Sequence, residues 1–597
     1  MATTSDEALK RTHSCGQLRA SDIGGEVRLC GWVRSYRDHG GIVFVDLRDR
    51  DGITQIVFDP TDSAERHELA RQLRAEWVIS VGGKVRPRGA DRVNPKLPTG
   101  EVEVIATDLV VLNKADTVPF DPETAKDVAE ETRLKYRYID MRRPEMTRNL
   151  VVRSKIAQAM RRVLDARGFL EVETPFMTRF TPGGARNFLV PSRQHPGTFY
   201  ALPESPQLFK QILMIGGLDK YYQIARCFRD EDLRADRQMD FTQLDVEMAF
   251  VTEQNIMEMT NEVMREVCTA AGKSFPDQPL IMPYKQATDE YGIDRPDLRF
   301  EMKLRDVSEI AKASTFKVMT DTLAKGGVVK GLAAPGGAKF TRKEIDAYIA
   351  YAGDFGAKGL AWTKLENGQF AGGSAKFFDA AGQAALRERL GANDGDILFM
   401  VADEVDAANK ALAALRCKLG ADLKLYSPDA MAFCWVTEFP LLEFSQQEQT
   451  WVSKHHPFTS PRPEDLDKLE TDPGAVLARA YDIVLNGVEL GGGSIRIHSP
   501  EVQARIFKRL GISDEEAKEK FSFLLDALRF GAPPHGGIAL GLDRIVMMMV
   551  GAESLREVIA FPKTARGICP LTEAPGTVSA RQLRELHIAI TAKPEKS

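Results

Sequence analysis

Residues 221–250 constrain the fold of this 597-residue chain more than any other stretch. Alternation with period two runs from Gln223 to Arg229, gives way to a highly charged segment, and resumes at Phe241. Two alternating segments joined by a polar loop predict a β-hairpin. On its second strand the apolar and the polar positions fall on opposite faces: Thr242, Leu244, Val246 and Met248 against Gln243, Asp245 and Glu247.

The polar face of this strand needs partners, which a ligand could supply. Arg229 ends the first strand beside the charged loop. A guanidinium group can bind phosphate oxygens through two parallel hydrogen bonds, and carboxylates can hold Mg²⁺. The hairpin therefore favours a nucleotide site, with a solvated sheet face as the alternative.

Two glycine-rich stretches near the C-terminal end support the same interpretation. Gly536–Arg544 leads into an apolar helix, and Glu489–Arg496 is flanked by a carboxylate and a guanidinium group. Glycines allow a backbone to approach a flat ring or a phosphate closely, although many ordinary strand-to-helix turns look similar.

The length predicts about three to five domains, so the chain is expected to be a multidomain α+β protein. The net charge is −5, from 85 acidic and 80 basic residues, so no global basic field marks a nucleic-acid-binding protein, but local basic patches fit within a balanced total, and the charge alone neither shows nor excludes nucleic acid. No apolar run reaches the roughly 20 residues of a membrane-spanning helix, and the N-terminal residues do not resemble a signal peptide. We expect a cytoplasmic protein that binds neither membrane nor DNA.

Residues 1–112 are expected to form the first domain. Five short alternating segments lie between Glu26 and Ala106, and a helix capped by Ser63 and reaching Glu76 is expected between the third and fourth. This order predicts a five-stranded OB barrel.

The remaining boundaries follow from changes in pattern. Residues 113–135 contain prolines and clustered acids and are expected to be a hinge. A pattern of amphipathic helix followed by strand begins at 136 and resumes after an interruption too long for a loop, which indicates an inserted domain. The expected parts are 136–282, 283–424 for the insertion, and 425–597, which includes a C-terminal extension.

Three ordered motifs give this chain a resemblance to a known family. Residues 168–175 (GFLEVETP) resemble motif 1 of the class II aminoacyl-tRNA synthetases, 228–231 (FRDE) with its hairpin resembles motif 2, and 541–544 (GLDR) resembles motif 3. Residues 205–211 (SPQLFKQ), 241–247 (FTQLDVE) and 453–458 (SKHHPF) are similar to the aspartyl-tRNA synthetase subgroup. In its bacterial form this subgroup has an N-terminal OB domain and an insertion between motifs 2 and 3.

The resemblance implies an antiparallel catalytic sheet with flanking helices, a homodimer, and ATP-dependent attachment of L-aspartate to tRNA through an aspartyl-adenylate. Lys210 and Arg496 would receive the side-chain carboxylate of aspartate, with His455 nearby. The implied aspartate site also includes Gln207, Arg229, Gln243 and Asp245.

The resemblance further implies a site for ATP and Mg²⁺. Arg229 would bind the α-phosphate, Arg544 the γ-phosphate, and Glu489 the metal, with Lys210, Arg229 and Arg544 as the catalytic set. The implied ATP site is completed by Asp230, Glu231, Gln238, Gly541, Leu542 and Asp543.

The OB domain supplies an expected anticodon site. Val43, Val45 and Leu47 point into the barrel, so Phe44 points outward near Arg34, Arg37 and Arg48. An exposed aromatic ring among arginines can stack on an unpaired base, although the ring could instead pack under a loop. The implied anticodon residues are Arg37, His39, Phe44 and Gln55.

Two positions distinguish this chain within the resemblance. His39 stands where enzymes specific for tRNA-Asp commonly have leucine, which favours charging of both tRNA-Asp and tRNA-Asn. Gly183 stands where the family usually has a glutamate that contacts the ammonium group of the substrate. Its loss predicts weaker aspartate binding, by about 1.5 to 3 kcal/mol, unless another acid or water substitutes.

Other functions remain open at this stage. A strictly tRNA-Asp-specific enzyme is the first alternative, and an asparaginyl or lysyl enzyme of the same subclass is the second. A non-catalytic RNA-binding relative is opposed by the joint presence of Arg229, Glu489 and Arg544, which a binding module does not need.

Overall fold

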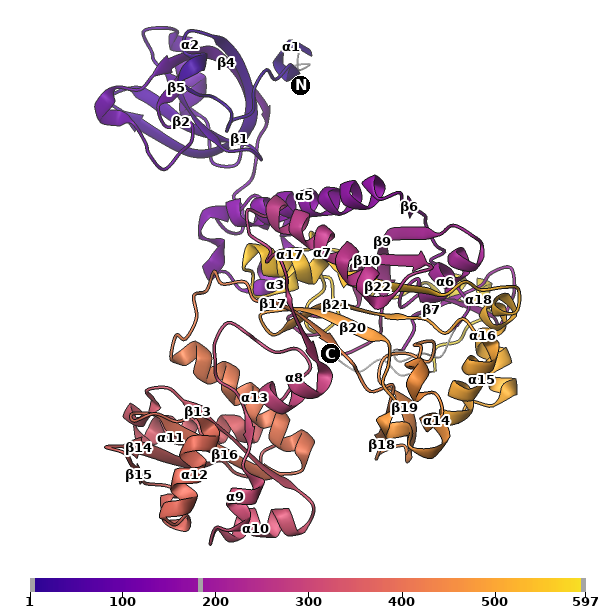
Figure 1. Ribbon diagram of the computed structural model, residues 1–597. Helices are drawn as coiled ribbons and strands as arrows, with labels where there is room; N and C mark the ends of the chain where they lie inside the picture. Colours follow the sequence, from indigo (N-terminus) through magenta and orange to yellow (C-terminus); the bar gives the residue numbers. More distant parts are fainter. Residues whose placement is uncertain (1–5, 181–185, 592–597) are drawn as a thin grey trace. The chain divides into compact units, whose positions relative to one another are not determined.

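The computed structural model describes residues 6–180 and 186–591 of the chain (Figure 1). It divides into two compact units: one extends to Val151 and includes 560–564 and 568–575, and the other contains most of the remaining residues. Among the described residues, no helix is long and apolar enough to cross a membrane.

The first unit contains a closed five-stranded barrel with strand order β1-β2-β3-β5-β4. The alternating apolar residues form its core, and the predicted strands are confirmed. They are β1 (Glu26–His39), β2 (Ile42–Arg48), β3 (Ile53–Phe58), β4 (Val78–Pro87) and β5 (Val102–Asn113).

Helix α2 (Ala64–Arg71) lies between β3 and β4 and is shorter than expected. Ser63 caps it as predicted, because its side chain accepts a hydrogen bond from the backbone of Arg66. The expected extension to Glu76 was wrong, since Glu76 has a positive φ of 66° and forms a buried ion pair with Arg48 (2.8 Å). The helix ends at Arg71, and the backbone of Glu76 donates to Val33 of β1 (2.7 Å) instead of continuing it.

The expected hinge is more ordered than its composition indicated. It contains the 3₁₀-helix η3 (Pro122–Asp127) and the short helix α3 (Glu130–Lys135). Asp121 accepts a hydrogen bond from the backbone of Glu123, and Phe120 and Ala125 are buried with Ile139. A small apolar cluster and a capped turn therefore replace the expected irregular segment.

The second unit contains an eight-stranded sheet with order β11-β17-β20-β21-β22-β10-β9-β6. Its inner pairs are antiparallel, as expected, whereas the edge strands β6 and β11 pair in parallel. The strands are β6 (Leu170–Glu171), β9 (Lys220–Phe228), β10 (Asp240–Ala249), β11 (Leu280–Pro283), β17 (Phe433–Thr437), β20 (Ala480–Leu485), β21 (Val488–Ile495) and β22 (His535–Gly541).

Apolar helices bury one face of this sheet. Residues of α5 (Pro144–Ala166), α7 (Glu253–Ala270) and α17 (Leu542–Val550) share a core with Leu244 and Val246 of β10. Around the sheet lie α6 (Gln207–Ile215), α15 (Pro500–Arg509), α16 (Asp514–Leu528), α18 (Ala580–Glu585) and the small hairpins β7–β8 (Leu189–Pro191, Phe199–Ala201) and β18–β19 (Leu442–Ser445, Thr450–Ser453).

Within the expected insertion, a separate five-stranded sheet has order β12-β13-β16-β14-β15 and two apolar cores. Its strands are β12 (Arg305–Asp306), β13 (Val328–Ala334), β14 (Ala361–Glu366), β15 (Gln369–Ala371) and β16 (Ile397–Asp403). The helices of this segment are α8 (Tyr284–Tyr291), α9 (Ser308–Lys312), α10 (Lys317–Ala324), α11 (Arg342–Asp354), α12 (Ala380–Leu390) and α13 (Val405–Asp422).

Candidate active site

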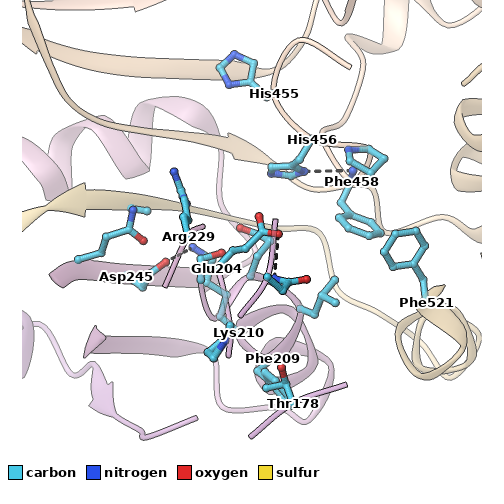
Figure 2. A pocket seen from close by; sticks show the side chains of 18 of the residues that line it. Thr178, Glu204, Phe209, Lys210, Arg229, Asp245, His455, His456, Phe458 and Phe521 are labelled. Carbon is cyan, nitrogen blue, oxygen red and sulfur yellow. Dashed lines mark hydrogen bonds and ion pairs between the residues drawn. The ribbon is translucent and has the colours of Figure 1, made fainter. Parts of the chain in front are cut away.

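A cavity of about 690 Å³ lies on the side of the eight-stranded sheet away from its apolar core (Figure 2). It brings together eight of the predicted site residues, which come from α6, the loop after β9, β10 and the segments that follow β19 and β21. These residues are Gln207, Lys210, Arg229, Glu231, Gln243, Asp245, His455 and Arg496.

The floor of the cavity is a buried cluster of four charges. The Lys210 ammonium lies 3.0 Å from Asp245 Oδ1 and 3.5 Å from Glu247 Oε2. The guanidinium of Arg496 holds Glu247 through two hydrogen bonds, of 2.9 and 3.1 Å. All four side chains are at most 2% exposed, so each charge depends on its neighbours.

Burial affects the two acids of this cluster differently. Burial raises the pKa of the Asp245 carboxyl, and Lys210 only partly opposes this effect. Burial also acts to raise the pKa of Glu247, but attraction to Arg496 and Lys210 outweighs it and holds that pKa below its ordinary value. Glu247 is therefore a fixed anion that positions Arg496, whereas Asp245 keeps one oxygen, Oδ2, without a hydrogen-bond partner among the described residues.

The alternation predicted for β10 explains this placement. Leu244 and Val246 pack into the helix-covered core, which turns Asp245 and Glu247 to the opposite face. That face is not solvated, because α6 lies on it and contributes Lys210. The buried charge cluster therefore supports the interpretation of β10 as a strand whose polar face binds a ligand.

Two adjacent histidines line the cavity in different environments. His455 packs edge-on against Phe439, and burial, aided by nearby Lys454 and Arg496, lowers its pKa to about 4. His456 accepts a hydrogen bond from Arg496 (2.9 Å), and burial holds its pKa well below the ordinary value. Sequence reasoning chose His455 and missed His456, because a His-His pair does not reveal which ring faces the arginine.

Arg229 is held over the ring of Phe241, 5.0 Å from its centroid, directly after β9. Its Nε is buried and has no hydrogen-bond acceptor among the described side chains and backbone. An arginine donor without an acceptor is costly unless a ligand supplies one. The residue is therefore suited to an anionic ligand, as the hairpin pattern predicted.

Motif 3 is placed next to the hairpin by strand pairing. Gly541 of β22 pairs with Gln243, and Arg544 donates to the backbone carbonyl of Glu489 (2.7 Å). Leu542 is buried in the apolar core, and the Asp543 carboxylate accepts from the Thr242 backbone (2.7 Å) and pairs with Arg153 (2.5 Å). These two side chains connect the helix to the sheet, so only their backbone remains to face a nucleotide.

Asp482, which sequence reasoning missed, lies on β20 near Glu489. Burial and repulsion from Glu489 raise its pKa well above the ordinary value, and its Oδ1 lacks a partner within the described chain. Gly492 on the neighbouring strand makes room for it, because an added Cβ would lie 2.3 Å from that oxygen. An acid within the otherwise apolar run 480–485 was the available signal.

This acidic pair fits a metal that also binds phosphate. Among residues 6–180 and 186–591, no group of three or more histidines, cysteines and acids could hold a metal ion. Mg²⁺ usually needs only one or two carboxylates, since water and substrate phosphates complete its coordination. Asp482 and Glu489 would hold such an ion, and its chemistry would be to neutralise charge on bound phosphates.

Several predicted residues lie outside the lining of this cavity. They are Asp230, Gln238, Glu489 and Gly541 to Arg544. Glu231 lines the cavity and pairs with Arg237 (3.3 Å), whereas Gln238 is buried in the hairpin loop. Gly183 lies outside the described residues.

The predicted anticodon residues belong to the barrel of the first unit. Phe44 is half-buried, and the His39 ring lies edge-on to the Phe44 ring, with the two ring centroids 6.4 Å apart. Arg37 bonds Asp46 (3.0 Å) and Gln55 (3.2 Å), and the Gln55 amide donates to Glu103 (2.7 Å).

The expected ring of arginines around Phe44 was wrong in part. Arg48 is buried against Glu76, and Arg34 forms two hydrogen bonds with Glu123 (3.0 and 2.9 Å). The Glu76 carboxylate compensates the buried charge of Arg48, and this pairing removes the arginine from the surface. Of the three arginines, Arg37 is the one that pairs directly opposite Phe44.

An antiparallel sheet that carries a charged hairpin and a strand-to-helix arginine, in a chain that also contains an OB barrel, is the arrangement that the resemblance to class II aminoacyl-tRNA synthetases implied. The chain belongs to the "tRNA synthetases class II (D, K and N)" family, whose model matches residues 129–565, and an "OB-fold nucleic acid binding domain" model matches 27–112. The family that the three motifs predicted is thereby confirmed.

Curated relatives cover almost the whole chain. An aspartate–tRNA(Asp/Asn) ligase from Desulfatibacillum aliphaticivorans is 51% identical over 98% of this chain and 99% of its own length. An aspartate–tRNA ligase from Geobacillus kaustophilus is 52% identical over 98% and 99%. A solved asparaginyl-tRNA synthetase from Pyrococcus horikoshii shares the fold, with a TM-score of 0.58, 19% identity and coverage of 93% and 98%.

Proposed function

We propose that this chain activates L-aspartate with ATP and transfers it to the 3′ end of tRNA. The observation that carries the proposal is the pairing of Lys210 and Arg496 in one buried cluster at the bottom of the cavity. Two cations held in place by Asp245 and Glu247 suit an anionic side chain such as that of aspartate. A neutral amide or a lysine side chain would leave these cations without an added anion, which disfavours the asparaginyl and lysyl alternatives.

Arg229 supports the activation step. Its Nε donor lies at the same cavity as Lys210, so it can bind the carboxylate of aspartate and the α-phosphate of ATP together. Attack of the α-carboxylate on the α-phosphorus forms the adenylate and releases pyrophosphate. The negative charge that develops on the phosphoryl oxygens would be stabilised by Arg229. No general base is needed, because the carboxylate is ionised at neutral pH.

Arg544 and the acidic pair would hold the rest of ATP. Arg544 lies at the start of α17, where its position is fixed by the Glu489 carbonyl, and it is assigned to the γ-phosphate. Asp482 and Glu489 are assigned to Mg²⁺. Asp230, Glu231, Gln238 and the backbone of 541–543 are assigned to the nucleotide.

The tRNA specificity proposed is for both tRNA-Asp and tRNA-Asn. Relatives with the narrower and with the wider name have similar identity to this chain, so identity alone does not choose between them. His39 beside Phe44 supports the wider specificity. Arg37, Phe44 and Gln55 are proposed to bind the anticodon, with Phe44 stacked on a base.

The proposal includes a cytoplasmic homodimer in which residues 1–112 bind the anticodon and 113–135 connect them to the catalytic parts, 136–282 and 425–597. Residues 283–424 are proposed as an inserted domain with a separate sheet, which the two apolar cores of that segment support.

Two assays test the function. Exchange of pyrophosphate into ATP should depend on L-aspartate, and a response to asparagine or lysine in place of aspartate would contradict the proposal. Purified tRNA-Asp and tRNA-Asn transcripts should both be charged with aspartate, and rejection of tRNA-Asn would restrict the enzyme to tRNA-Asp.

A further inference from the structure

His456 faces a hydrogen-bond donor at each nitrogen of its ring. Nε2 lies 2.9 Å from Arg496 Nη1, and Nδ1 lies 3.2 Å from the backbone nitrogen of Phe458, a contact that Figure 2 draws. Burial holds the pKa of His456 well below its ordinary value, so the ring is neutral and carries a single N–H. Either position of that proton makes one of the two contacts a meeting of two donors. The proton position therefore decides whether His456 can bind Arg496.

The hydroxyl of Thr459 is a further group beside Nδ1. Its Oγ1 lies 3.4 Å from His456 Nδ1 and 3.4 Å from Ser494 Oγ. Ser494 Oγ in turn accepts a hydrogen bond from Arg496 Nη1 (2.7 Å). A hydroxyl both accepts and donates, whereas the backbone N–H of Phe458 only donates. Thr459 can therefore accept from Nδ1–H and pass its own proton to Ser494.

The contact with Arg496 determines which proton position is favoured. A hydrogen bond from a charged donor is roughly twice as strong as one between neutral groups, so the ring gains more by accepting at Nε2 than by accepting at Nδ1. Thr459, Ser494 and Arg496 are each at most 2% exposed, so water does not replace a lost partner. The tautomer with the proton on Nδ1 keeps the bond from Arg496, and Thr459 supplies the acceptor that this tautomer needs.

The backbone holds Thr459 in this place. Its N–H donates to the His456 carbonyl (3.1 Å), and Ile497 donates to the Phe458 carbonyl (2.9 Å). Thr459 also forms an isolated antiparallel bridge with Arg496. Residues opposite each other in such a bridge have side chains on the same face. The hydroxyl is thus carried by the segment that pairs with the residues following β21, next to the arginine that it serves.

We infer that Thr459 is a positioning residue that fixes the proton of His456 on Nδ1 and thereby holds Arg496 toward the side-chain carboxylate of aspartate. The inference rests on the proposed function and deepens it, because it names a residue on which recognition of that carboxylate depends. His456 and Arg496 line the cavity, and Thr459 acts through them. Without its hydroxyl, Nδ1 keeps the backbone N–H of Phe458 as its neighbour, the proton moves to Nε2, and the new N–H is directed at the guanidinium group.

The test is Thr459→Val, which keeps the shape of the side chain and removes the hydroxyl. In pyrophosphate exchange, the KM for L-aspartate should rise about 10-fold while the KM for ATP changes by less than about threefold. Thr459→Ser keeps a hydroxyl, so its KM for aspartate should stay within about threefold of the wild-type value. An unchanged KM for aspartate in Thr459→Val would overturn the inference.

Thr260→Val is the matched control. Thr260 is a fully buried threonine of α7, and its Oγ1 has no hydrogen-bond partner among the described residues. Helix α7 packs in the apolar core, on the face of the sheet away from the cavity. The control should leave the KM values for aspartate and ATP unchanged. A similar rise in the KM for aspartate would mean that any buried threonine-to-valine exchange has this effect, which would overturn the inference.

L-Asparagine separates recognition of the carboxylate from a general defect of the segment. Its side chain has the shape of aspartate but carries no charge for Arg496 to bind. As an inhibitor of exchange, asparagine should therefore weaken by less than about threefold in Thr459→Val, and the selectivity for aspartate should fall. Equal weakening of both amino acids would mean that Thr459 only supports the fold of the segment, and the inference would be wrong.

The proton position can also be measured in the wild-type protein, in case Thr459→Val does not fold. Nitrogen NMR of the protein with isotope-labelled histidine distinguishes protonated from unprotonated ring nitrogens, and His456→Gln identifies the signals of His456 by their loss. Without ligand, Nδ1 should be protonated, and a proton on Nε2 would overturn the inference. Failure of the wild-type protein to exchange pyrophosphate with aspartate would instead refute the proposed function, so the two failures are distinguishable.

Discussion

Arg496 reaches Glu247 across an intervening strand. Arg496 follows β21 and Glu247 lies on β10, with β22 between them in the sheet. The residue of β22 opposite Glu247 is Gly537, and a Cβ there would lie 2.1 Å from Glu247 Oε2. The ion pair that positions the proposed aspartate site therefore depends on a glycine that no charge pattern identifies.

Gly537→Ala should disrupt this pair. The added methyl group must displace the Glu247 carboxylate or the backbone of Val246, which also lies 2.1 Å away. We expect loss of at least about 2 kcal/mol of stability and a large rise in the KM for aspartate. Gly353→Ala in helix α11 is the control, because its added methyl group would meet no atom within 4 Å beyond the local helix backbone, and it should be neutral or slightly stabilising. Denaturant unfolding measures the stability of the two variants, and equal changes in their stability would contradict the proposed role of Gly537.

Glu247→Gln should destabilise the protein far more than the loss of a surface ion pair. Removing one partner of a buried pair leaves Arg496 uncompensated, which costs about 3 to 5 kcal/mol. Glu470→Gln breaks the exposed pair with Arg505 and should cost less than about 1 kcal/mol. Chemical denaturation of the two variants gives the comparison, and similar losses would refute the assignment of Glu247 as a buried anion.

Asp482→Asn should weaken the response to Mg²⁺ without harming the fold. The variant removes one of two mutually repelling acids, so the protein without metal should be as stable as the wild type or more stable. The Mg²⁺ concentration for half-maximal pyrophosphate exchange should rise about tenfold or more. Thermal unfolding with and without Mg²⁺ measures the effect on stability. An unchanged Mg²⁺ requirement in pyrophosphate exchange would exclude Asp482 from the metal site.

The low pKa of His455 predicts a specific pH dependence of stability. Folded His455 takes up a proton only near pH 4, whereas the unfolded residue does so near pH 6.5. Its contribution is therefore present above pH 6.5 and is lost as the pH falls toward 4, by about 2 to 3 kcal/mol. Unfolding free energies of the wild type and His455→Asn at pH 7.5 and 4.5 should show a smaller decline for the variant. Equal declines would contradict a neutral, buried His455.

Phe44→Ala should separate tRNA recognition from activation. Loss of one base-stacking contact costs about 1 to 3 kcal/mol, so kcat/KM for charging should fall about 5- to 150-fold. Pyrophosphate exchange without tRNA should not change. A fall in exchange as well would indicate a general folding defect, and unchanged charging would exclude Phe44 from the anticodon site.

Local patterns predicted the secondary structure and the polarity of the site. The alternation along β10 assigned Asp245 and Glu247 to one face, and the Ser63 cap marked the start of α2, because these features depend on neighbours in the chain. The same information failed at Glu76, whose backbone lies outside the helix with a positive φ, and at Arg48, which a long-range ion pair with Glu76 removes from the surface.

The chain's residue order thus specified the strands, the caps and the charged residues of this protein, since periodicity and capping act over a few residues. Pairing across the sheet decided the rest: that His456 bonds Arg496, that Asp482 lies near Glu489, and that Gly537 makes room for Glu247. Glu247 and Gly537 lie on strands that are distant in sequence, and His456 lies 40 positions from Arg496, whereas Asp482 and Glu489 lie on the two strands of one hairpin. These relationships follow from strand register and burial, because these determine which residue lies beside each charged side chain in the folded protein.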